Sequence, residues 1–172
     1  MEKEDLILPA ILILIFLILI VTIFSFAGNN TFQTGKVYFE YPNNWAQEHV
    51  VGNFSNSSIY SQVTLTANFN DVKGQTQTSY ILFIMQKRTE GVLNIPSSSS
   101  VLMNTTNSSV ASVDIGNFQA SQIGNYGNDV AQKITIVETS NYYYVVQYVC
   151  PSFALNQTEE AYNMILKSFR VS

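Results

Sequence analysis

An unbroken apolar stretch near the start of the chain, from Leu6 to Ala27, constrains this sequence more than any other feature. Its 22 residues are mostly Leu, Ile, Val and Phe, and none of them is charged. A helix of this length spans about 33 Å, which is enough to cross the roughly 30 Å hydrocarbon core of a bilayer. We therefore expect a membrane-spanning helix followed by one folded domain, because the remaining length suits a single domain.

The same stretch has a second interpretation as a cleaved signal peptide. Ser25-Phe26-Ala27 has the small-x-small pattern that precedes a cleavage site. The apolar part of a signal peptide is usually about 7–15 residues long, however, and this stretch is longer. We therefore predict an uncleaved N-terminal transmembrane signal anchor over residues 1–27, with cleavage as the alternative.

Two features indicate on which side of the membrane the domain lies. Lys3 is the single basic residue before the stretch, which gives a slight bias toward a cytoplasmic N-terminus. Six Asn-x-Ser/Thr acceptor tripeptides follow the stretch, about twice the number that composition alone would give. They begin at Asn29, Asn53, Asn56, Asn104, Asn107 and Asn156. This excess favours a glycosylated outer face, although an Asn-rich composition also produces such tripeptides. We expect a single-pass cell-membrane protein with its N-terminus inside and its domain outside.

A short polar segment, Gly28 to Gly35, separates the apolar stretch from the domain that we place at residues 36–172. Glycine at both ends and polar residues between them predict a flexible linker. Its eight residues reach at most about 28 Å. The domain therefore stays near the bilayer, and we expect its partner to be a membrane or envelope protein.

Composition excludes several classes of function. Charged residues make up 12 % of the chain, against roughly 25 % in typical soluble proteins. There is no run of basic residues, so we expect no nucleic-acid partner. Cys150 is the single cysteine, which excludes an intrachain disulfide and a zinc site built on cysteines.

The domain contains several segments with the alternation or apolar content of β-strands. We predict strands over residues 36–41, 58–69, 79–87, 117–123, 130–138 and 142–150. In the second of these, one alternating face carries Ile59, Val63, Leu65, Ala67 and Phe69. In the last, one face carries Tyr142, Tyr144, Val146, Tyr148 and Cys150. The 79–87 segment is apolar throughout its middle, so we expect it to be covered on both faces.

One segment near the end of the chain has a clear helical pattern, from Asn156 to Lys167. Asn156 and Glu159 have the spacing of a cap and capping box. The buried stripe should consist of Ala161, Tyr162, Ile165, Leu166 and Phe169. Residues 169–171 read as a short final strand, and residues 94–109 as a short helix or irregular crossing. Strands in hairpins with a segregated helix predict an α+β fold on an antiparallel sheet.

Motifs at both ends of the domain resemble one family. Phe39 to Trp45 (FEYPNNW) resembles the opening signature of PsbP-like domains, a strand ending in Tyr-Pro-x-x-Trp. Tyr144 to Pro151, followed by residues 161–171, is similar to the family's last strand, last helix and closing Ser-Phe-x-Val. The layout of one anchor and one domain looks most like the membrane-anchored PsbP-related proteins of methanogenic archaea.

This resemblance implies an α/β/α sandwich around a central antiparallel sheet. It implies a packing role for Tyr41, Pro42 and Trp45, and it implies no shared activity. Members of the wider family mostly act as accessory or assembly factors.

The residues that most often carry chemistry do not form a reactive constellation in the sequence. His49 is the single histidine, and we predict that it lies on the surface. We predict that Cys150 is a buried, inert thiol rather than a nucleophile, because it ends an apolar strand. We therefore expect no catalytic residue, cofactor or metal site.

Two polar or aromatic runs have both a functional and a structural interpretation. Asn68, Asn70 and Asp71 resemble part of a calcium loop, but Val72 and the missing bidentate Glu favour a plain turn. The run from Tyr142 to Tyr144 could stack on a sugar or a partner's side chain, but cross-strand packing is the simpler interpretation.

We conclude from the sequence that the chain is a non-catalytic, membrane-tethered accessory or binding module on the outer face of the membrane. A structural surface glycoprotein and a carrier of a small or lipidic ligand are the alternatives.

Overall fold

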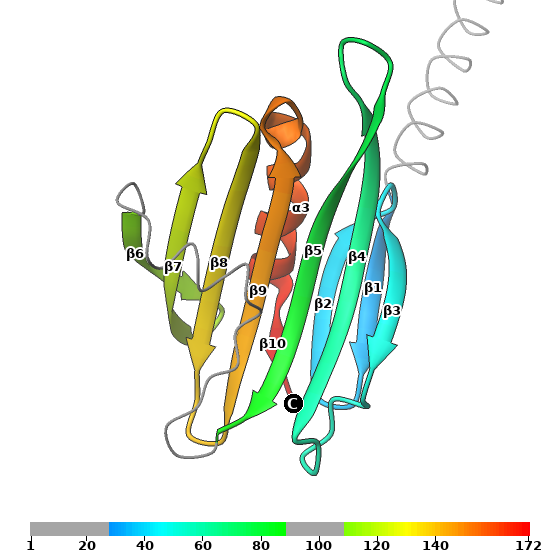
Figure 1. Ribbon diagram of the computed structural model, residues 1–172. Helices are drawn as coiled ribbons and strands as arrows, with labels where there is room; N and C mark the ends of the chain where they lie inside the picture. Colours follow the sequence, from blue (N-terminus) through cyan, green and yellow to red (C-terminus); the bar gives the residue numbers. More distant parts are fainter. Residues whose placement is uncertain (1–27, 89–108) are drawn as a thin grey trace, which may run out of the picture.

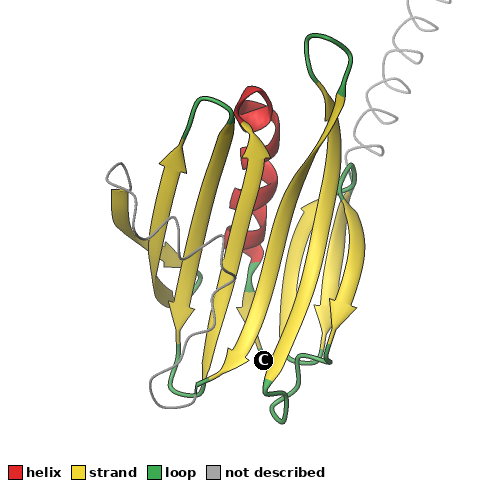
Figure 2. Cartoon of the chain, in the orientation of Figure 1, coloured by secondary structure: helices red, strands yellow, loops and turns green. Residues whose placement is uncertain are grey.

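The computed structural model describes residues 28–88 and 109–172, and in these ranges the chain is mostly antiparallel β-structure with one α-helix (Figures 1 and 2). The strands are β1 (Asn29–Thr34), β2 (Val37–Pro42), β3 (Ala46–Val51), β4 (Tyr60–Asn70), β5 (Thr76–Lys87), β6 (Ser109–Ile115), β7 (Phe118–Tyr126), β8 (Val130–Glu138), β9 (Tyr142–Pro151) and β10 (Arg170–Val171). A short 3-10 turn, η2 (Ser152–Ala154), leads into α3 (Leu155–Ser168).

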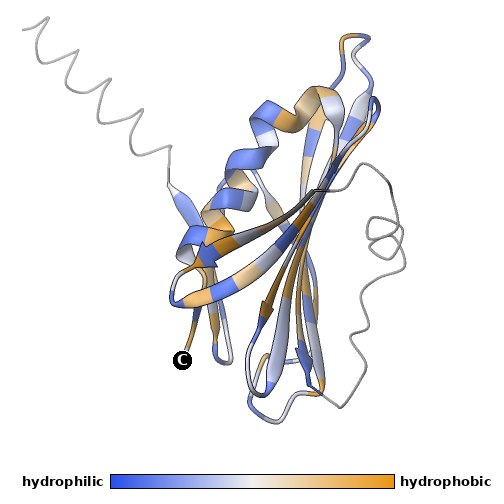
Figure 3. Cartoon of the chain, turned by 90° about the vertical axis from the view of Figure 1, so that its left-hand side faces the viewer, coloured by the Kyte–Doolittle hydropathy of each residue, from blue (hydrophilic) through white to orange (hydrophobic). Residues whose placement is uncertain are grey.

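The strands form two sheets that lie in two layers. The larger sheet has seven strands in the order β3-β4-β5-β9-β8-β7-β6, and every neighbouring pair is antiparallel. The smaller sheet has the order β1-β2-β10. Together with α3 it lies on one face of the larger sheet, as the two perpendicular views show (Figures 1 and 3). We call this the inner face and the opposite one the outer face.

The alternating segments of the sequence form the centre of the larger sheet. Val63, Leu65 and Ala67 of β4 are buried on the inner face. All five predicted inward residues of β9 are buried as well, from Tyr142 to Cys150. A strand points successive side chains to opposite faces, so these patterns fix which face the second layer covers. The predictions for these two faces are confirmed, except at Ile59.

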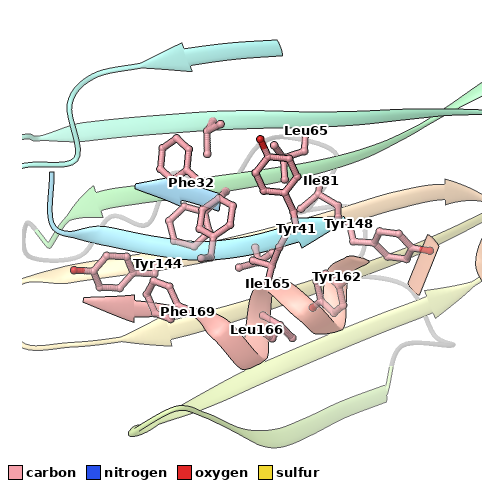
Figure 4. Packing of buried hydrophobic residues seen from close by; sticks show 14 of the residues in the cluster. Phe32, Tyr41, Leu65, Ile81, Tyr144, Tyr148, Tyr162, Ile165, Leu166 and Phe169 are labelled. Carbon is pink, nitrogen blue, oxygen red and sulfur yellow. The ribbon is translucent and has the colours of Figure 1, made fainter. Parts of the chain in front are cut away.

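Aromatic rings fill the space between the layers (Figure 4). Phe39 of β2 lies 4.9 Å from Phe32 of β1 and 5.0 Å from Phe83 of β5, measured between ring centroids. Phe83 in turn lies 5.4 Å from Phe169, which follows α3. Close ring pairs of this kind add stability beyond the burial of their area. The cluster therefore joins both sheets and the end of the helix.

The signature near the start of the domain is part of this core. Trp45 is 2 % exposed and Tyr41 is 6 % exposed, while Pro42 is half-buried at the end of β2. The backbone N–H of Trp45 donates a hydrogen bond to the carbonyl of Pro42, which closes the turn. These positions agree with the packing role expected for Tyr41 and Trp45.

The predicted α+β class is confirmed. The helix was also predicted well, because α3 extends from Leu155 to Ser168 and buries Ala161, Tyr162, Ile165 and Leu166. In the described residues, no helix is long and apolar enough to span a membrane. The predicted anchor at 1–27 and nearly all of the predicted element at 94–109 lie outside the described residues.

The linker predicted for residues 28–35 is wrong. Residues 29–34 form β1, which pairs with all of β2. Phe32 accounts for this outcome, because its side chain is 2 % exposed and packs between Phe39 and Phe54. One buried aromatic residue among polar ones gave too weak a pattern to predict a strand.

Other predictions need smaller corrections. Ile59 precedes β4 and is 72 % exposed, so it is not part of the buried face. Asn156 does not cap α3, since Ala154 occupies the cap position and no side chain bonds there. Helix α3 follows directly from η2, which leaves no room for a capping box. Strands β3 and β6 were not predicted at all.

Candidate functional site

A groove of about 560 Å³ runs along the exposed side of α3, where the helix meets the small sheet. We call it the helix groove. Its lining is mixed in charge and, apart from Met164, polar: Glu40, Asn156, Glu159, Glu160, Asn163, Met164, Lys167, Ser168 and Arg170. The apolar stripe of α3 faces the core, so this opposite side of the helix is left to polar residues.

Strand β2 holds Glu40 at one wall of the helix groove. The backbone N–H of Glu40 donates a hydrogen bond to Oγ of Ser168 at 2.7 Å, which ties β2 to the last turn of α3. Its carboxylate accepts hydrogen bonds from the Tyr38 hydroxyl at 2.9 Å and from Nδ2 of Asn29 at 3.3 Å. The Tyr38–Glu40 hydrogen bond raises the pKa of Tyr38. Glu40 is therefore a positioned carboxylate rather than a freely rotating one.

Basic groups lie near these carboxylates. Arg170 of β10 lies beside the Tyr38 ring, at 5.9 Å from guanidinium carbon to ring centroid. Lys133 of β8 forms an ion pair with Glu159 of α3. Burial lowers the pKa of Lys133, but the bonds and charges of Glu159 and Tyr126 outweigh that effect and leave the pKa raised. Lys133 itself does not line the groove, whose basic residues are Lys167 and Arg170, so acidic and basic groups lie within one surface.

This arrangement suits recognition of a polar segment. The lining of the helix groove includes no histidine, cysteine or tyrosine. The groove carries negative carboxylates and positive Lys and Arg groups, so it matches a partner surface that also carries both signs of charge. Such electrostatic complementarity gives orientation and specificity.

The structure places His49 and Cys150 in different environments. His49 is exposed on β3, as predicted. Cys150 is 1 % exposed, also as predicted, and its sulfur accepts a hydrogen bond from the Tyr148 hydroxyl at 2.9 Å. Burial raises the pKa of Tyr148. A buried thiol beside a neutral phenol is not an activated nucleophile.

The two runs with alternative interpretations both make contacts within the fold. Oδ1 of Asp71 accepts hydrogen bonds from the backbone N–H groups of Lys73 and Gln75, which forms a turn. Tyr142 and Tyr144 are buried, and Tyr143 is half-buried. In the part of the chain that the structure describes, no group of three or more His, Cys, Asp or Glu side chains could hold a metal ion.

The described acceptor asparagines fall into two groups. Asn29, Asn53 and Asn56 are exposed on β1 and on the loop before β4. Asn156 is also exposed, but the hydroxyl of its tripeptide, on Thr158, is buried and donates to the carbonyl of Ala154 at 2.9 Å. Asn104 and Asn107 lie outside the described residues.

Sequence reasoning did not find the helix groove. Glu40 and Arg170 are far apart in the sequence and meet because β10 pairs with β2, with Arg170 opposite Tyr38. The sequence indicated only one residue of the groove, Glu40. It alternates with Phe39 and Tyr41 in a predicted strand, so its side chain had to face away from the core.

Comparisons with known proteins give distant structural likenesses and no match in sequence. No family model matches the sequence, and no curated protein matches it. Among solved structures, the chain is similar to the crystal structure of LpqN, involved in cell envelope biogenesis of Mycobacterium tuberculosis. The two share 16 % sequence identity over 84 % of this chain and 91 % of that chain, with a TM-score of 0.48.

Proposed function

We propose that this chain is a non-catalytic module, tethered to the outer face of the membrane by residues 1–27, that binds a neighbouring membrane or envelope protein through the helix groove. The observation that carries this proposal is the position of β1. It begins at Asn29, two residues after the apolar stretch ends at Ala27. A folded domain attached this closely can reach only partners that lie in or against the same membrane.

The contact between Asn29 and Glu40 links the groove to this tether. Asn29 is the first residue of β1, and its side chain bonds the Glu40 carboxylate at one wall of the groove. The groove therefore opens near the point where the chain would leave the membrane. We propose that its occupant is a polar segment of mixed charge next to the membrane-spanning part of the partner.

Photo-crosslinking in cells tests this function. A photoreactive amino acid at Asn163, in the groove, should attach the full-length protein to one abundant neighbour, identified by mass spectrometry. The matched control is Val72, which is fully exposed on the turn between β4 and β5 and does not line the groove. Reversing charge with Lys167→Glu should weaken the Asn163 crosslink. Equal patterns from the two positions would contradict the proposal.

We also propose that the complete chain is a PsbP-like α/β/α sandwich related to archaeal membrane-anchored proteins. Strands β5 and β6 are parallel, because three antiparallel strands separate them in the sheet. Parallel strands of one sheet are joined by right-handed crossovers in nearly all proteins. In Figure 1 both strands run downward, with β5 on the right, β6 on the left and α3 behind the sheet. Helix α3 covers the inner face, so the second helical layer of the proposed sandwich lies on the outer face.

The outer face has apolar side chains for such a layer to cover. Ile84, Ile134 and Val145, on three neighbouring strands, form a second apolar cluster there. We propose that the outer layer of the sandwich covers this cluster. If this is correct, Ile136→Cys, made in a Cys150→Ser background, should react slowly with a water-soluble maleimide, and rapid labelling would contradict it.

A structural surface glycoprotein is the second candidate, favoured by the exposure of Asn29, Asn53 and Asn56. Intact glycopeptide mass spectrometry of native material tests it, and unmodified asparagines at all three positions would remove it. We do not propose the lipid carrier, because Tyr162, Ile165 and Tyr148 fill the space between α3 and the sheet.

A further inference from the structure

A second groove, of about 340 Å³, lies on the outer face of the larger sheet at the end formed by β3, β4 and β5. We call it the β3–β5 groove. It is lined by Glu48, His49, Thr64, Thr66, Asn68, Thr78 and Tyr80. From these residues we propose that the β3–β5 groove binds a neutral sugar. This inference does not rest on the proposed function, because it uses different residues on the opposite face from α3.

A β-bulge assembles the wall of this groove. Strand β3 pairs with β4 at Gln47 and Leu65 and next at Val50 and Val63, so β3 carries one extra residue between these pairs. In a regular strand Glu48 and His49 would point to opposite faces. A bulge redirects side chains locally, and here both residues line the same groove.

The floor of the groove combines an aromatic ring with polar side chains. Tyr80 of β5 lies directly opposite Thr66 of β4 and is 46 % exposed. Thr64 and Asn68 stand two residues away on either side of Thr66, and Thr78 pairs with Asn68. The apolar C–H face of a sugar ring packs against an aromatic ring, while its hydroxyls need hydrogen-bond partners around that ring.

Internal hydrogen bonds orient these partners. Oγ1 of Thr66 donates to Oε1 of Glu48 at 2.9 Å, and Oγ1 of Thr78 donates to Oδ1 of Asn68 at 2.7 Å. Each bond occupies one oxygen and holds the rest of the group in place. Glu48 keeps its second carboxylate oxygen as an acceptor, and Asn68 keeps its NH2 group as a donor. Sugar hydroxyls both donate and accept, so they match this combination.

The charge and size of the groove exclude other ligand classes. No Lys or Arg lines the groove, and Glu48 disfavours an anion such as a phosphate. Glu48 and His49 supply too few ligating side chains for a metal ion, and no aliphatic side chain lines the groove for a lipid tail. A volume near the lower end of ligand pockets, which run from roughly 300 to 1,000 Å³, fits a mono- or disaccharide.

Saturation-transfer NMR on the full-length protein tests this site. The protein is held in nanodiscs, because many detergents carry sugar headgroups. The probes are glucose, galactose, mannose, N-acetylglucosamine, maltose and cellobiose. At least one of them should receive saturation from the wild-type protein. If none does, the proposal is wrong.

Variants then assign the binding to the groove. Tyr80→Ala should weaken binding about tenfold, since it removes the ring that the sugar packs against. Tyr80→Phe should retain binding, because the ring remains. Tyr60→Ala is the matched control, since Tyr60 is also exposed on β4 but does not line the groove. Glu48→Gln, at an exposed position, should weaken binding without affecting the fold. Binding that survives both Tyr80→Ala and Glu48→Gln would overturn the proposal.

Discussion

The hydroxyl of Tyr162, on α3, forms a buried hydrogen bond with Oγ1 of Thr135 at the centre of β8. Nε2 of Gln122, on β7, donates to both oxygens, at 3.0 Å to Thr135 and 3.2 Å to Tyr162. The three side chains form one polar group between α3 and the larger sheet. Because buried polar groups are costly unless they are paired, this group allows only one position of the helix along the sheet.

We predict that Tyr162→Phe lowers the free energy of unfolding by about 1–2 kcal/mol, because it removes one hydrogen-bonding oxygen from a buried group. Thr135→Val should cost a similar amount. The double variant should cost less than the sum, since each single change leaves the other group short of a partner. Urea unfolding of the three variants measures this, and strictly additive costs would contradict the predicted coupling.

Phe32 should matter as much as any residue of the core, although it lies in a segment that looks like a linker. We predict that Phe32→Ala lowers the free energy of unfolding by about 3–5 kcal/mol, the usual cost of removing a buried ring. Gln33→Ala, at the next and exposed position, should change it by less than about 0.5 kcal/mol. Thermal or urea unfolding distinguishes the two, and equal effects would indicate that β1 contributes nothing to the core.

Replacing Gly35 and Gly74 by alanine compares the stability cost of a side chain at two turn positions with left-handed backbone. Both have positive φ, 56° at Gly35 and 76° at Gly74. A Cβ at Gly35 would lie 2.3 Å from the carbonyl oxygen of Phe54, whereas nothing lies within 4 Å of one at Gly74. Gly74→Ala should cost about 1–2 kcal/mol from backbone strain alone. Gly35→Ala should cost clearly more, and similar unfolding midpoints for the two variants would argue against the close contact.

Buried tyrosines should make the domain sensitive to alkali. Burial raises the pKa of Tyr144 and of Tyr162 to about 12. In the unfolded chain a tyrosine loses its proton near pH 10. The contribution of these two tyrosines to the free energy of unfolding is therefore fully present below about pH 10. It falls as the pH rises from about 10 to about 12.

Urea unfolding at a series of pH values measures this loss of stability, and tyrosinate absorbance reports the ionisation of the tyrosines at each pH. The unfolding midpoint should fall over that range, and Tyr162→Phe should make the fall shallower. A midpoint independent of pH up to about 12 would contradict it.

Glycan occupancy should differ among the acceptor asparagines if the chain is glycosylated. The Asn156 tripeptide lies in α3 with the Thr158 hydroxyl buried, whereas Asn29, Asn53 and Asn56 are exposed outside helices. Once the domain has folded, Asn156 should be the poorest substrate of these four. Glycopeptide mass spectrometry gives the occupancies, and a fully modified Asn156 would show that modification precedes folding.

The elements that could be predicted are those whose own residues define a face. Strands β4 and β9 and helix α3 each carry several apolar residues at the required spacing. Strand β3 could not be found in this way, because all six of its residues are exposed at the edge of the sheet. Strand β1 has one buried residue, Phe32, and that single residue defines no period.

The two grooves could not be predicted for a different reason. Glu40 and Arg170 line one groove only because β2 pairs with β10, which is distant in the sequence. Glu48 and Tyr80 line one groove because β3 pairs with β4 and β4 with β5, and β3 was not predicted. Nothing in a local pattern specifies which strand will lie beside which. The surface histidine and the buried cysteine were predictable because each depends on its immediate neighbours alone.

The small sheet has a consequence for the order of events during synthesis. It joins β1 and β2, at the start of the domain, to β10 at residues 170–171. The core between the layers therefore closes only after Arg170 and Val171 have emerged from the ribosome. Contacts between such distant segments also slow folding. The domain should complete its folding only after residues 170–171 have been synthesised, and until then Phe32, Phe39 and Phe83 remain exposed to chaperones and to other nascent chains.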